Sequence, residues 1–367
     1  MRVGIVGGGQ LGRMLAQAAH PLGISCATLD PATASPAAQV APAIVGAYDD
    51  RTALLSLADA SDVVTYEFEN VPVDAARYAA GFVPVLPPPN ALEVAQDRLA
   101  EKALFTEVGL PVPPFVRVDD VASLRAGLEA IGTPAVLKTR RLGYDGKGQA
   151  IIRHAELAEE AWRAVGEAPS ILEAFVVFDR EVAIIGARAR SGAIAFYPVV
   201  ENEHREGILR VTRAPAPRLS DALQATAEAY AGAVMDRLAY VGVLAIELFE
   251  VGGGLQGNEM APRVHNSGHW TIEGAETSQF EQHLRAICDL PLGATDMLGL
   301  ATMVNLVGSI PDRSAVLQIP GAHLHLYGKD PRPGRKVGHV TVRADDDKTL
   351  AKRVDRLLQA VGHVADA

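Results

Sequence analysis

Short apolar runs alternate with helical patterns along roughly the first ninety residues, and this alternation restricts the fold more than any other feature. Parallel strands need a crossover helix between them, so this alternation predicts a parallel α/β sheet. One helix is expected from about 10 to 20. Prolines at 84 and 87–89 close this unit and prolines at 111 and 113–114 follow one helix later, which predicts a domain boundary between them. The expected strands lie at 2–6, 24–29, 62–66 and 82–86.

The middle of the chain has a different pattern. Its strand-like runs are less regularly interleaved with helices, which indicates an α+β domain with antiparallel pairing. A helix is expected at about 221–238, and a second at the end of the chain, where three aspartates at 345–347 precede an apolar stripe as cap and dipole partners. The expected strands lie at 135–138, 170–174, 181–188, 194–199 and 208–213, and then near 322–327 and 337–343.

Composition excludes several classes of protein. The formal net charge of −10 argues against a general nucleic-acid binder, because phosphate backbones require clustered Lys and Arg. Cys26 and Cys288 lie far apart without CxxC or His companions, so we expect no disulfide scaffold or structural zinc site. No apolar stretch approaches the length of a membrane span or a signal-peptide core. The sequence therefore predicts a cytoplasmic globular protein that binds neither nucleic acid nor membranes.

A glycine loop follows the first expected strand. Gly7, Gly9 and Gly12 form a GxGxxG pattern, and Asp30 ends the next strand. This is close to a dinucleotide-binding fingerprint, in which the loop approaches a pyrophosphate and the acid binds a ribose hydroxyl. Two other interpretations stay open: a tight turn that serves only helix–sheet packing, and a loop that holds the phosphate of another ligand.

A second loop carries both cations and glycines. Lys138, on an expected strand, precedes a basic segment over 139–149 that contains three glycines. A strand lysine supplies a fixed charge for phosphate oxygens, and a flexible glycine loop can fold its N–H groups over a polyphosphate. The order is not that of a Walker loop, and a solvated basic hairpin is the alternative. Glu173 and Glu181 would suit hydrogen bonds to adenine and ribose, although they could equally be surface strand ends.

Two acids face each other across an expected hairpin. Alternation along the apolar run before it places Glu247 on one face, and glycines at 252–254 permit a tight turn. With the turn centred near Gly253, Glu247 and Glu259 lie opposite each other with Cβ atoms roughly 5 Å apart. Two such carboxylates repel unless a cation lies between them, and Mg²⁺ prefers one or two carboxylates together with phosphate oxygens. The pair predicts a magnesium site, with acids that simply face water as the alternative.

Donors crowd the residues after this hairpin. Arg263, His265 and Asn266 form a cluster that can bind a small planar anion and stabilise charge developing on it. A further basic group could close a phosphate pocket with the first glycine loop or form a solvated loop. Its members are Lys329, Arg335, Lys336 and His339.

Taken together, these motifs resemble the ATP-grasp superfamily and, within it, the N5-carboxyaminoimidazole ribonucleotide synthases of purine biosynthesis. The resemblance covers nearly the whole chain. It is carried by GGGQLGRM at 7–14, YEFENV at 66–71, KTRRLGYDGKGQ at 138–149, ENEHREGIL at 201–209, NEMAPRVHNSGHWT at 258–271, TSQFEQHLRAI at 277–287 and YGKDPRPGRKVGHV at 327–340.

The resemblance implies a multidomain fold of α/β and α+β character. It implies a Rossmann-like preATP-grasp domain over 1–100, a grasp domain over 101–295 with a mobile lid at about 114–177, and a small C-terminal domain over 296–367. The implied activity is that of an ATP-dependent carbon–nitrogen ligase, which carboxylates 5-aminoimidazole ribonucleotide with bicarbonate through carboxyphosphate. ATP and Mg²⁺ are the implied cofactors, and a homodimer is the expected assembly.

The family also implies a role for each matching residue. Bicarbonate and carboxyphosphate chemistry falls to Arg263, His265 and Asn266, with Tyr144 and Asp145 at the imidazole substrate and Asp145 as base. Glu247 and Glu259 would bind magnesium. ATP contacts fall to Arg98, Lys138, Gly143, Tyr144, Asp145, Gly146, Lys147, Gly148, Gln149, Glu173, Ala174, Phe175, Val176, Glu181, His204, Asn258 and Glu259. Substrate contacts fall to Gly8, Gly9, Gln10, Leu11, Glu67, Glu69, Lys329, Arg335 and Lys336.

Two positions depart from the family pattern, and three rival functions remain. Leu142 stands where the loop usually has another glycine, and Val264 where proline is common. One rival is another grasp ligase, of the formate-using or glycinamide type, which would differ at 263–269 and 329–339. The others are a nicotinamide oxidoreductase, which leaves the paired acids unexplained, and a non-catalytic nucleotide-binding regulator.

Overall fold

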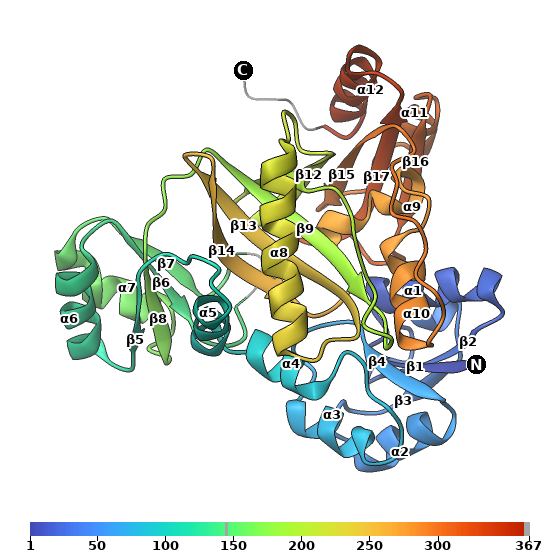
Figure 1. The fold of residues 1–367 in the computed structure, drawn as a ribbon, viewed down its shortest axis with the longest axis horizontal. Coiled ribbons are helices and arrows are strands. Elements are labelled where there is room, and N and C mark those ends of the chain that lie inside the picture. Colours follow the sequence, from blue (N-terminus) through green and yellow to red (C-terminus); the bar gives the residue numbers. More distant parts are fainter. Residues whose placement is uncertain (144–145, 363–367) are drawn as a thin grey trace.

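The computed structural model describes residues 1–143 and 146–362, and those residues form three β-sheets (Figure 1). The first sheet has the strand order β3-β2-β1-β4, and all its pairs are parallel, which confirms the predicted α/β unit. Its strands are β1 (Arg2–Val6), β2 (Ser25–Asp30), β3 (Ala43–Val45) and β4 (Val63–Tyr66). Its helices are α1 (Gln10–Ala19), α2 (Arg51–Asp59) and α3 (Val73–Ala80).

The strand predicted at 82–86 is wrong. Only Val85 pairs with the sheet, through an isolated bridge to Val64. Pro84 and the prolines from 87 onward lack N–H groups, so the segment cannot continue a ladder. The chain turns instead into α4 (Pro89–Ala95) and α5 (Arg98–Glu107).

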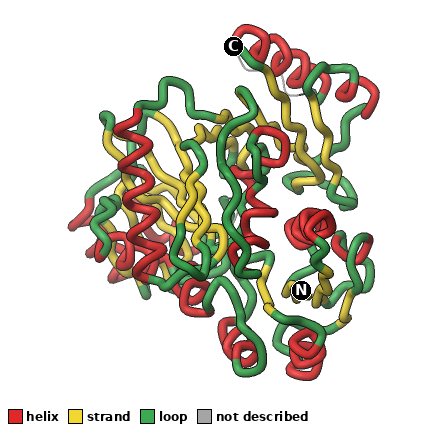
Figure 2. Tube along the Cα trace, turned by 45° about the vertical axis from the view of Figure 1, so that its right-hand side comes forward, coloured by secondary structure: helices red, strands yellow, loops and turns green. Residues whose placement is uncertain are grey.

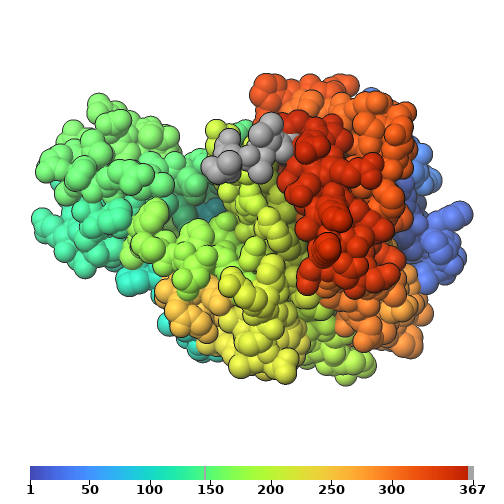
Figure 3. All heavy atoms as spheres, turned by 90° about the horizontal axis from the view of Figure 1, so that it is seen from above, coloured from blue at the N-terminus to red at the C-terminus, as the bar shows by residue number. Residues whose placement is uncertain are grey.

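A second, smaller sheet forms a lobe that projects at one end of the molecule (Figures 1 and 3). Its strand order is β5-β8-β6-β7, and two helices pack against it around a separate apolar cluster that contains Trp162. Its elements are β5 (Phe115–Val118), α6 (Val121–Ile131), β6 (Ala135–Thr139), β7 (Gln149–Ile152), α7 (Ala158–Ala164) and β8 (Ser170–Ala174).

The largest sheet runs through the centre of the molecule. Its strand order is β14-β13-β9-β11-β12-β15-β17-β16, with β10 paired to β9, and every pair is antiparallel as predicted. The run predicted at 194–199 is split at Pro198, so that β10 ends before it and β11 begins after it. The strands are β9 (Arg180–Arg188), β10 (Ile194–Phe196), β11 (Val200–Arg205), β12 (Ile208–Ala214), β13 (Gly242–Val251), β14 (Gly254–Ala261), β15 (Leu300–Val307), β16 (Ala322–Leu326) and β17 (Lys336–Ala344).

This sheet crosses the boundary expected at 295/296, because β12 pairs with β15. The second and third proposed domains therefore share a sheet, and the boundary between them remains a prediction. Helices cover the sheet and the C-terminal segment (Figure 2). They are α8 (Asp221–Arg237), α9 (Thr271–Gly274), α10 (Gln279–Ile287), α11 (Arg313–Leu317) and α12 (Asp347–Ala360).

The last helix begins as the sequence predicts. Asp346 is its N-cap, and the carboxylate accepts the backbone N–H of Thr349 at 2.9 Å. Leu357 of the predicted stripe is fully buried, while Leu350 and Val361 pack against the same cluster less completely. No helix within the described residues is both long and apolar enough to span a bilayer.

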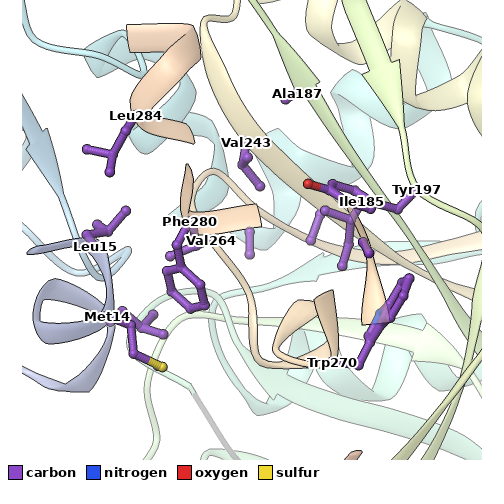
Figure 4. Close-up of a cluster of buried hydrophobic side chains, with 14 of the residues drawn as sticks. Met14, Leu15, Ile185, Ala187, Tyr197, Val243, Val264, Trp270, Phe280 and Leu284 are labelled. Atoms are coloured by element: carbon purple, nitrogen blue, oxygen red, sulfur yellow. The ribbon is translucent and has the colours of Figure 1, made fainter. Parts of the chain in front are cut away.

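One apolar cluster joins the first and the largest sheets. Met14 and Leu15 of α1 face Phe280 and Leu284 of α10, as Figure 4 shows. Side chains of the large sheet, among them Val243, continue the cluster. This core holds the glycine loop before α1 against the central strands, which positions the site described next.

Candidate active site

A pocket of about 730 Å³ lies where segments from all three parts of the chain meet. Many of the predicted site residues line it, although they are scattered along the sequence. Those that line it are Gln10, Leu11, Glu67, Glu69, Arg98, Gly143, Lys147, Glu247, Glu259, Arg263, His265, Asn266, Lys329, Arg335 and Lys336.

The hairpin of β13 and β14 places the two predicted acids directly opposite each other. Glu247 pairs with Glu259, as the sequence predicts. The register shifts immediately beyond this pair, where Leu248 opposes Gly257, so Asn258 is an extra residue in β14. The bulge was not predicted, because a turn centred on Gly253 would pair the two acids without it, whereas the observed turn is centred between Gly252 and Gly253.

Burial and charge act differently on the two acids. Burial raises the pKa of Glu247 above its ordinary value, and the negative charges of Glu259 and Glu181 raise it further. Burial acts the same way on Glu259, but the Arg98 guanidinium, whose Nη1 is 2.9 Å from Oε2, outweighs it and lowers the pKa of that carboxyl. The repulsion between the two acids is therefore present, and Arg98 offsets it on one side only.

His265 and Asn266 are held by hydrogen bonds from behind. Ser267 N–H donates to His265 Nδ1 at 3.3 Å, and Ser267 Oγ lies 2.8 Å from the same nitrogen. Nδ1 is therefore the acceptor, and the proton lies on Nε2, which is 3.8 Å from Glu247 Oε1. Burial and the nearby Arg263 lower the pKa of His265 to about 3, so the ring is neutral and offers an N–H donor.

Partners also fix the neighbouring donors. The amides of Asn266 and Asn305 exchange two hydrogen bonds, of 3.0 and 2.7 Å. Arg263 donates to Glu69 through both Nε and Nη2. Glu69, a predicted substrate residue, therefore holds Arg263 in the pocket.

The predicted nucleotide residues form pairs beside the acids. Lys138 Nζ lies 2.8 Å from Glu173 Oε2, and His204 Nδ1 lies 2.8 Å from Glu181 Oε2. The pKa of His204 is raised: burial opposes this, but the hydrogen bond to Glu181 and the charge of Glu247 outweigh it. His204 and Glu181 thus form a pair that interacts electrostatically with Glu247.

The glycine loop uses most of its N–H groups internally. Gly9 and Gly12 donate to the two oxygens of Glu67, and Gly8 donates to Asp30 at 2.8 Å. Asp30 also accepts from Tyr48 at 2.9 Å and is buried. The acid expected to bind a ribose in a dinucleotide enzyme is therefore engaged in the fold, while Gln10 and Leu11 line the pocket.

A basic group from the C-terminal segment lines the pocket beside α1. Lys329 donates to Gln10 Oε1, so it bridges the C-terminal segment and α1. Burial lowers the pKa of Lys329, and the charge of Glu67 opposes this shift. Arg332, Arg335 and Lys336 line the same wall.

Some predicted residues lie elsewhere. Tyr144 and Asp145 fall outside the described residues. Leu142 is exposed and has a φ of 64°, the left-handed conformation that glycine adopts most easily, which accounts for the glycine usual at this position. Within the described part of the chain, the predicted residues that do not line the pocket are Gly8, Gly9, Lys138, Gly146, Gly148, Gln149, Glu173, Ala174, Phe175, Val176, Glu181, His204 and Asn258.

Sequence reasoning also missed residues that line or support the pocket. Lys102 is buried, and its Nζ donates to the carbonyls of Gly257 and Asn258. Gln279 holds His265 through two hydrogen bonds. The spacing of Arg98, Glu101 and Lys102 along one helical face was a signal that could have indicated the first of these. The others came together only through long-range folding: they are Arg140, His269, Tyr327 and Arg332.

Family models match three segments of the chain. The ribonucleotide synthetase preATP-grasp domain matches 1–96, the ATP-grasp domain matches 103–280, and the phosphoribosylaminoimidazole carboxylase C-terminal domain matches 301–353. The N5-carboxyaminoimidazole ribonucleotide synthase of Pseudomonas aeruginosa is 51% identical over 354 residues, which cover 96% of this chain and 98% of the relative. That of Brucella melitensis is 52% identical over 347 residues, 92% and 95% of the two chains.

Solved structures agree with these matches. The N5-carboxyaminoimidazole ribonucleotide synthetase of Thermus thermophilus has a TM-score of 0.96 with 56% identity and covers 100% of both chains. The Aspergillus clavatus synthase in complex with ADP and 5-aminoimidazole ribonucleotide has a TM-score of 0.92 with 33% identity and covers 99% of both chains.

Proposed function

Because the chain belongs to the N5-carboxyaminoimidazole ribonucleotide synthases of the ATP-grasp family, it carboxylates aminoimidazole ribonucleotide with ATP in purine biosynthesis, and we propose how its pocket performs this reaction. The observation that carries the proposal is the shared pocket. Opposed carboxylates, a cluster of anion-binding donors and a basic wall all line one cavity of about 730 Å³.

We propose that the carboxyl donor is bicarbonate. A bicarbonate oxygen attacks the γ-phosphorus of ATP, ADP leaves, and carboxyphosphate forms. The exocyclic amine of the substrate then attacks the carboxyl carbon, phosphate leaves with the bonding electrons, and the amine loses a proton. Arg263, the Nε2–H of His265 and Asn266 supply fixed donors for the charge on the carboxyl oxygens, which supports their predicted role.

Glu247 and Glu259 fit a magnesium ion. Directly opposed carboxylates repel, and burial already raises the pKa of Glu247, so a divalent cation would relieve a conflict that Arg98 offsets on one side only. A bound Mg²⁺ would neutralise phosphate charge during phosphoryl transfer. The protein's own contribution is to hold the two acids on one face of the hairpin, with Lys138 nearby as a second positive charge.

The basic wall is proposed to hold the phosphate of aminoimidazole ribonucleotide. Lys329, Arg335 and Lys336 provide positive charge there, and Gln10 and Leu11 begin a helix whose N-terminus favours anions. The Aspergillus clavatus relative was solved with both ADP and this ribonucleotide, which supports a site for each. Tyr144 and Asp145 keep their proposed place at the imidazole ring, with Asp145 accepting the proton. The homodimer and the cytoplasmic location also stay proposals.

The rival functions are less compatible with these contacts. A nicotinamide enzyme would need the Asp30 carboxylate for a ribose, yet that carboxylate accepts from Gly8 and Tyr48. A formate-using or glycinamide-type ligase would differ at 263–269 and 329–339, the segments that carry the anion-binding and basic groups.

Oxygen transfer tests the carboxyphosphate route. Bicarbonate labelled with ¹⁸O is supplied with ATP and aminoimidazole ribonucleotide, and the phosphate released is analysed by mass spectrometry. Attack by bicarbonate leaves one labelled oxygen on the phosphate. Unlabelled phosphate, with carboxylated product formed, would contradict the proposal. Parallel reactions without bicarbonate, or with formate in its place, should form no product.

A further inference from the structure

One face of α5 contacts four consecutive residues of β14, the strand that carries Glu259. Arg98, Glu101 and Lys102 are spaced i, i+3 and i+4, so they point the same way from the helix. Arg98 Nη1 lies 2.9 Å from Glu259, and Glu101 accepts the N–H of Met260 at 2.7 Å. Lys102 Nζ donates to the carbonyls of Gly257 and Asn258, at 3.0 and 2.8 Å. The helix therefore contacts every residue from 257 to 260.

The bulge in β14 decides which face Glu259 occupies. From the turn up to Leu248 opposite Gly257 the pairing is regular, and continuing it would place Glu247 opposite Asn258. Successive side chains on a strand alternate between faces, so Glu259 would then point away from Glu247. The extra residue shifts the register by one and brings the two acids onto the same face.

Lys102 satisfies the backbone at this bulge. A bulge interrupts the ladder and leaves backbone groups that need other partners. The Lys102 ammonium has three donors and is 1% exposed, so the carbonyls of Gly257 and Asn258 are among its few partners. A buried ammonium is costly unless it is paired, which indicates that this contact has a specific use.

The Lys102 ammonium also lies close to two residues that are predicted to bind ATP, Glu173 and Lys138. Its Nζ lies 3.7 Å from Glu173 Oε2, and the same oxygen lies 2.8 Å from Lys138 Nζ. Burial would raise the pKa of Glu173, but the charges of Lys138 and Lys102 outweigh it and hold the pKa below its ordinary value. Glu173 is therefore a charged group shared by two lysines.

We propose that Lys102 is a positioning residue with two effects: it holds the β14 bulge that sets Glu259 opposite Glu247, and it shares Glu173 so that Lys138 stays available to a nucleotide phosphate. The inference rests on the proposed roles of Glu247, Glu259 and Lys138. Lys102 itself touches neither substrate nor metal in this account; it acts through the strand and through Glu173.

The first test measures how strongly magnesium tightens nucleotide binding. The dissociation constant of a non-hydrolysable ATP analogue is measured by titration calorimetry, with Mg²⁺ and again with a chelator, for the wild-type chain and for Lys102→Met. We expect the substitution to reduce the tightening due to Mg²⁺ by about tenfold, as is typical when a residue supporting a metal ligand is lost. An unchanged ratio of the two constants would overturn the bulge part of the proposal.

A matched control separates this effect from a general loss of stability. Leu104 lies on the same helix and is buried, but it contacts the apolar cluster rather than the bulge. Leu104→Ala should lower the free energy of unfolding and leave the effect of Mg²⁺ on nucleotide binding unchanged. If Leu104→Ala reduces that effect as much as Lys102→Met does, the role of Lys102 is only structural.

A double-mutant cycle between Lys102 and Glu173 tests whether Lys102 keeps Lys138 available to a nucleotide phosphate. Without Lys102, Glu173 has Lys138 as its main partner, so Lys102→Met should weaken binding of the metal-free analogue. Glu173→Gln removes the charge that holds Lys138, and the double variant should recover most of that loss. Additive losses in the double variant would overturn the shared-carboxylate part.

Glu259→Gln keeps this inference distinct from the proposed function. If Glu259→Gln abolishes the tightening by Mg²⁺ and Lys102→Met does not change it, the positioning role alone fails. If neither variant changes it, the metal assignment to the hairpin fails.

Discussion

At the scale of a single residue, a substitution of Lys336 tests most directly whether the basic wall binds the phosphate of aminoimidazole ribonucleotide. We expect Lys336→Ala to raise the KM for aminoimidazole ribonucleotide by about tenfold or more, because a hydrogen bond to a charged group contributes roughly 1.5–3 kcal/mol. The KM for ATP should change far less, because Lys336 is proposed to bind the phosphate of aminoimidazole ribonucleotide and not that of the nucleotide. Steady-state kinetics with each substrate varied measures the split. Lys348→Ala, an exposed position on α12, is the control, and equal losses for both substrates would argue against the phosphate role.

A substitution of Glu67 is expected to change the stability of the fold rather than the binding of substrate. Its two oxygens accept the N–H groups of Gly9 and Gly12, so Glu67→Gln would turn an amide donor toward one of those donors. The free energy of unfolding should fall by about 1–3 kcal/mol, the cost of leaving a buried donor unsatisfied. Urea denaturation measures it. A variant as stable as the wild-type chain would show that the carboxylate does not support the loop.

The residues of the pocket also show what the sequence could and could not predict about single positions. The types and spacing of Glu247, Glu259, Arg263 and His265 were enough to predict a phosphate-handling site. The pairing of Glu69 with Arg263 links positions far apart in the chain, and nothing in the local pattern indicates it. A residue's neighbours decide which of its atoms remain for a ligand, and those neighbours are known only after folding.

At the scale of elements, the hairpin was predictable and the bulge was not. A glycine turn between two alternating runs fixes the approximate pairing. The extra residue at Asn258 depends on α5, whose Lys102 accommodates the bulged carbonyls from a separate part of the chain. The false strand at 82–86 has a local cause, since the prolines within and after it were visible in the sequence and outweigh its apolar pattern.

His283 on α10 joins two sheets and gives the fold a pH dependence. Val243 N–H donates to Nδ1 at 3.1 Å, so Nε2 carries the proton and lies 2.9 Å from Thr65 Oγ1. Burial lowers the pKa of His283 from 6.5 to about 4. Between these values the unfolded chain binds more protons than the folded one, so the free energy of unfolding falls as the pH falls.

The matched variant is His283→Gln, which cannot take up that proton. Below about pH 6.5 the wild-type chain should lose stability relative to the variant by about 1.4 kcal/mol per pH unit, until about pH 4. Urea denaturation at several pH values gives both profiles. Parallel profiles across this window would show that His283 protonates equally in the folded and unfolded chain.

At the scale of the whole molecule, separate apolar clusters predict uneven stability. Leu284 lies in the cluster that joins α1 and α10 to the large sheet, while the lobe of β5 to β8 has its own cluster around Trp162. Leu284→Ala should cost about 2–5 kcal/mol, as large-to-small substitutions in a core do. Hydrogen exchange followed by mass spectrometry should then be faster in α1 and α10 and nearly unchanged in the lobe. Equal acceleration in the lobe would indicate one cooperative unit.

The sequence predicted the architecture of the whole molecule better than the boundaries between its domains. Alternating elements indicated the parallel sheet, and the family resemblance supplied the grasp fold. The continuous pairing from β14 to β16 could not be predicted, because β12 and β15 are separated along the chain by three α-helices, a hairpin and the donor cluster. The pocket depends on that continuity, which brings the basic wall of the C-terminal segment to the acids of the central one.

The most direct test of the account is ATP turnover by Glu259→Gln in the presence of Mg²⁺, bicarbonate and aminoimidazole ribonucleotide. Glu250→Gln is the matched control, because Glu250 lies on the same hairpin but pairs with Arg180 outside the pocket. We predict that Glu259→Gln folds normally by circular dichroism and forms no ADP above background, while Glu250→Gln keeps its turnover. Wild-type turnover by Glu259→Gln would contradict the assignment of the carboxylate pair to the metal and phosphate chemistry.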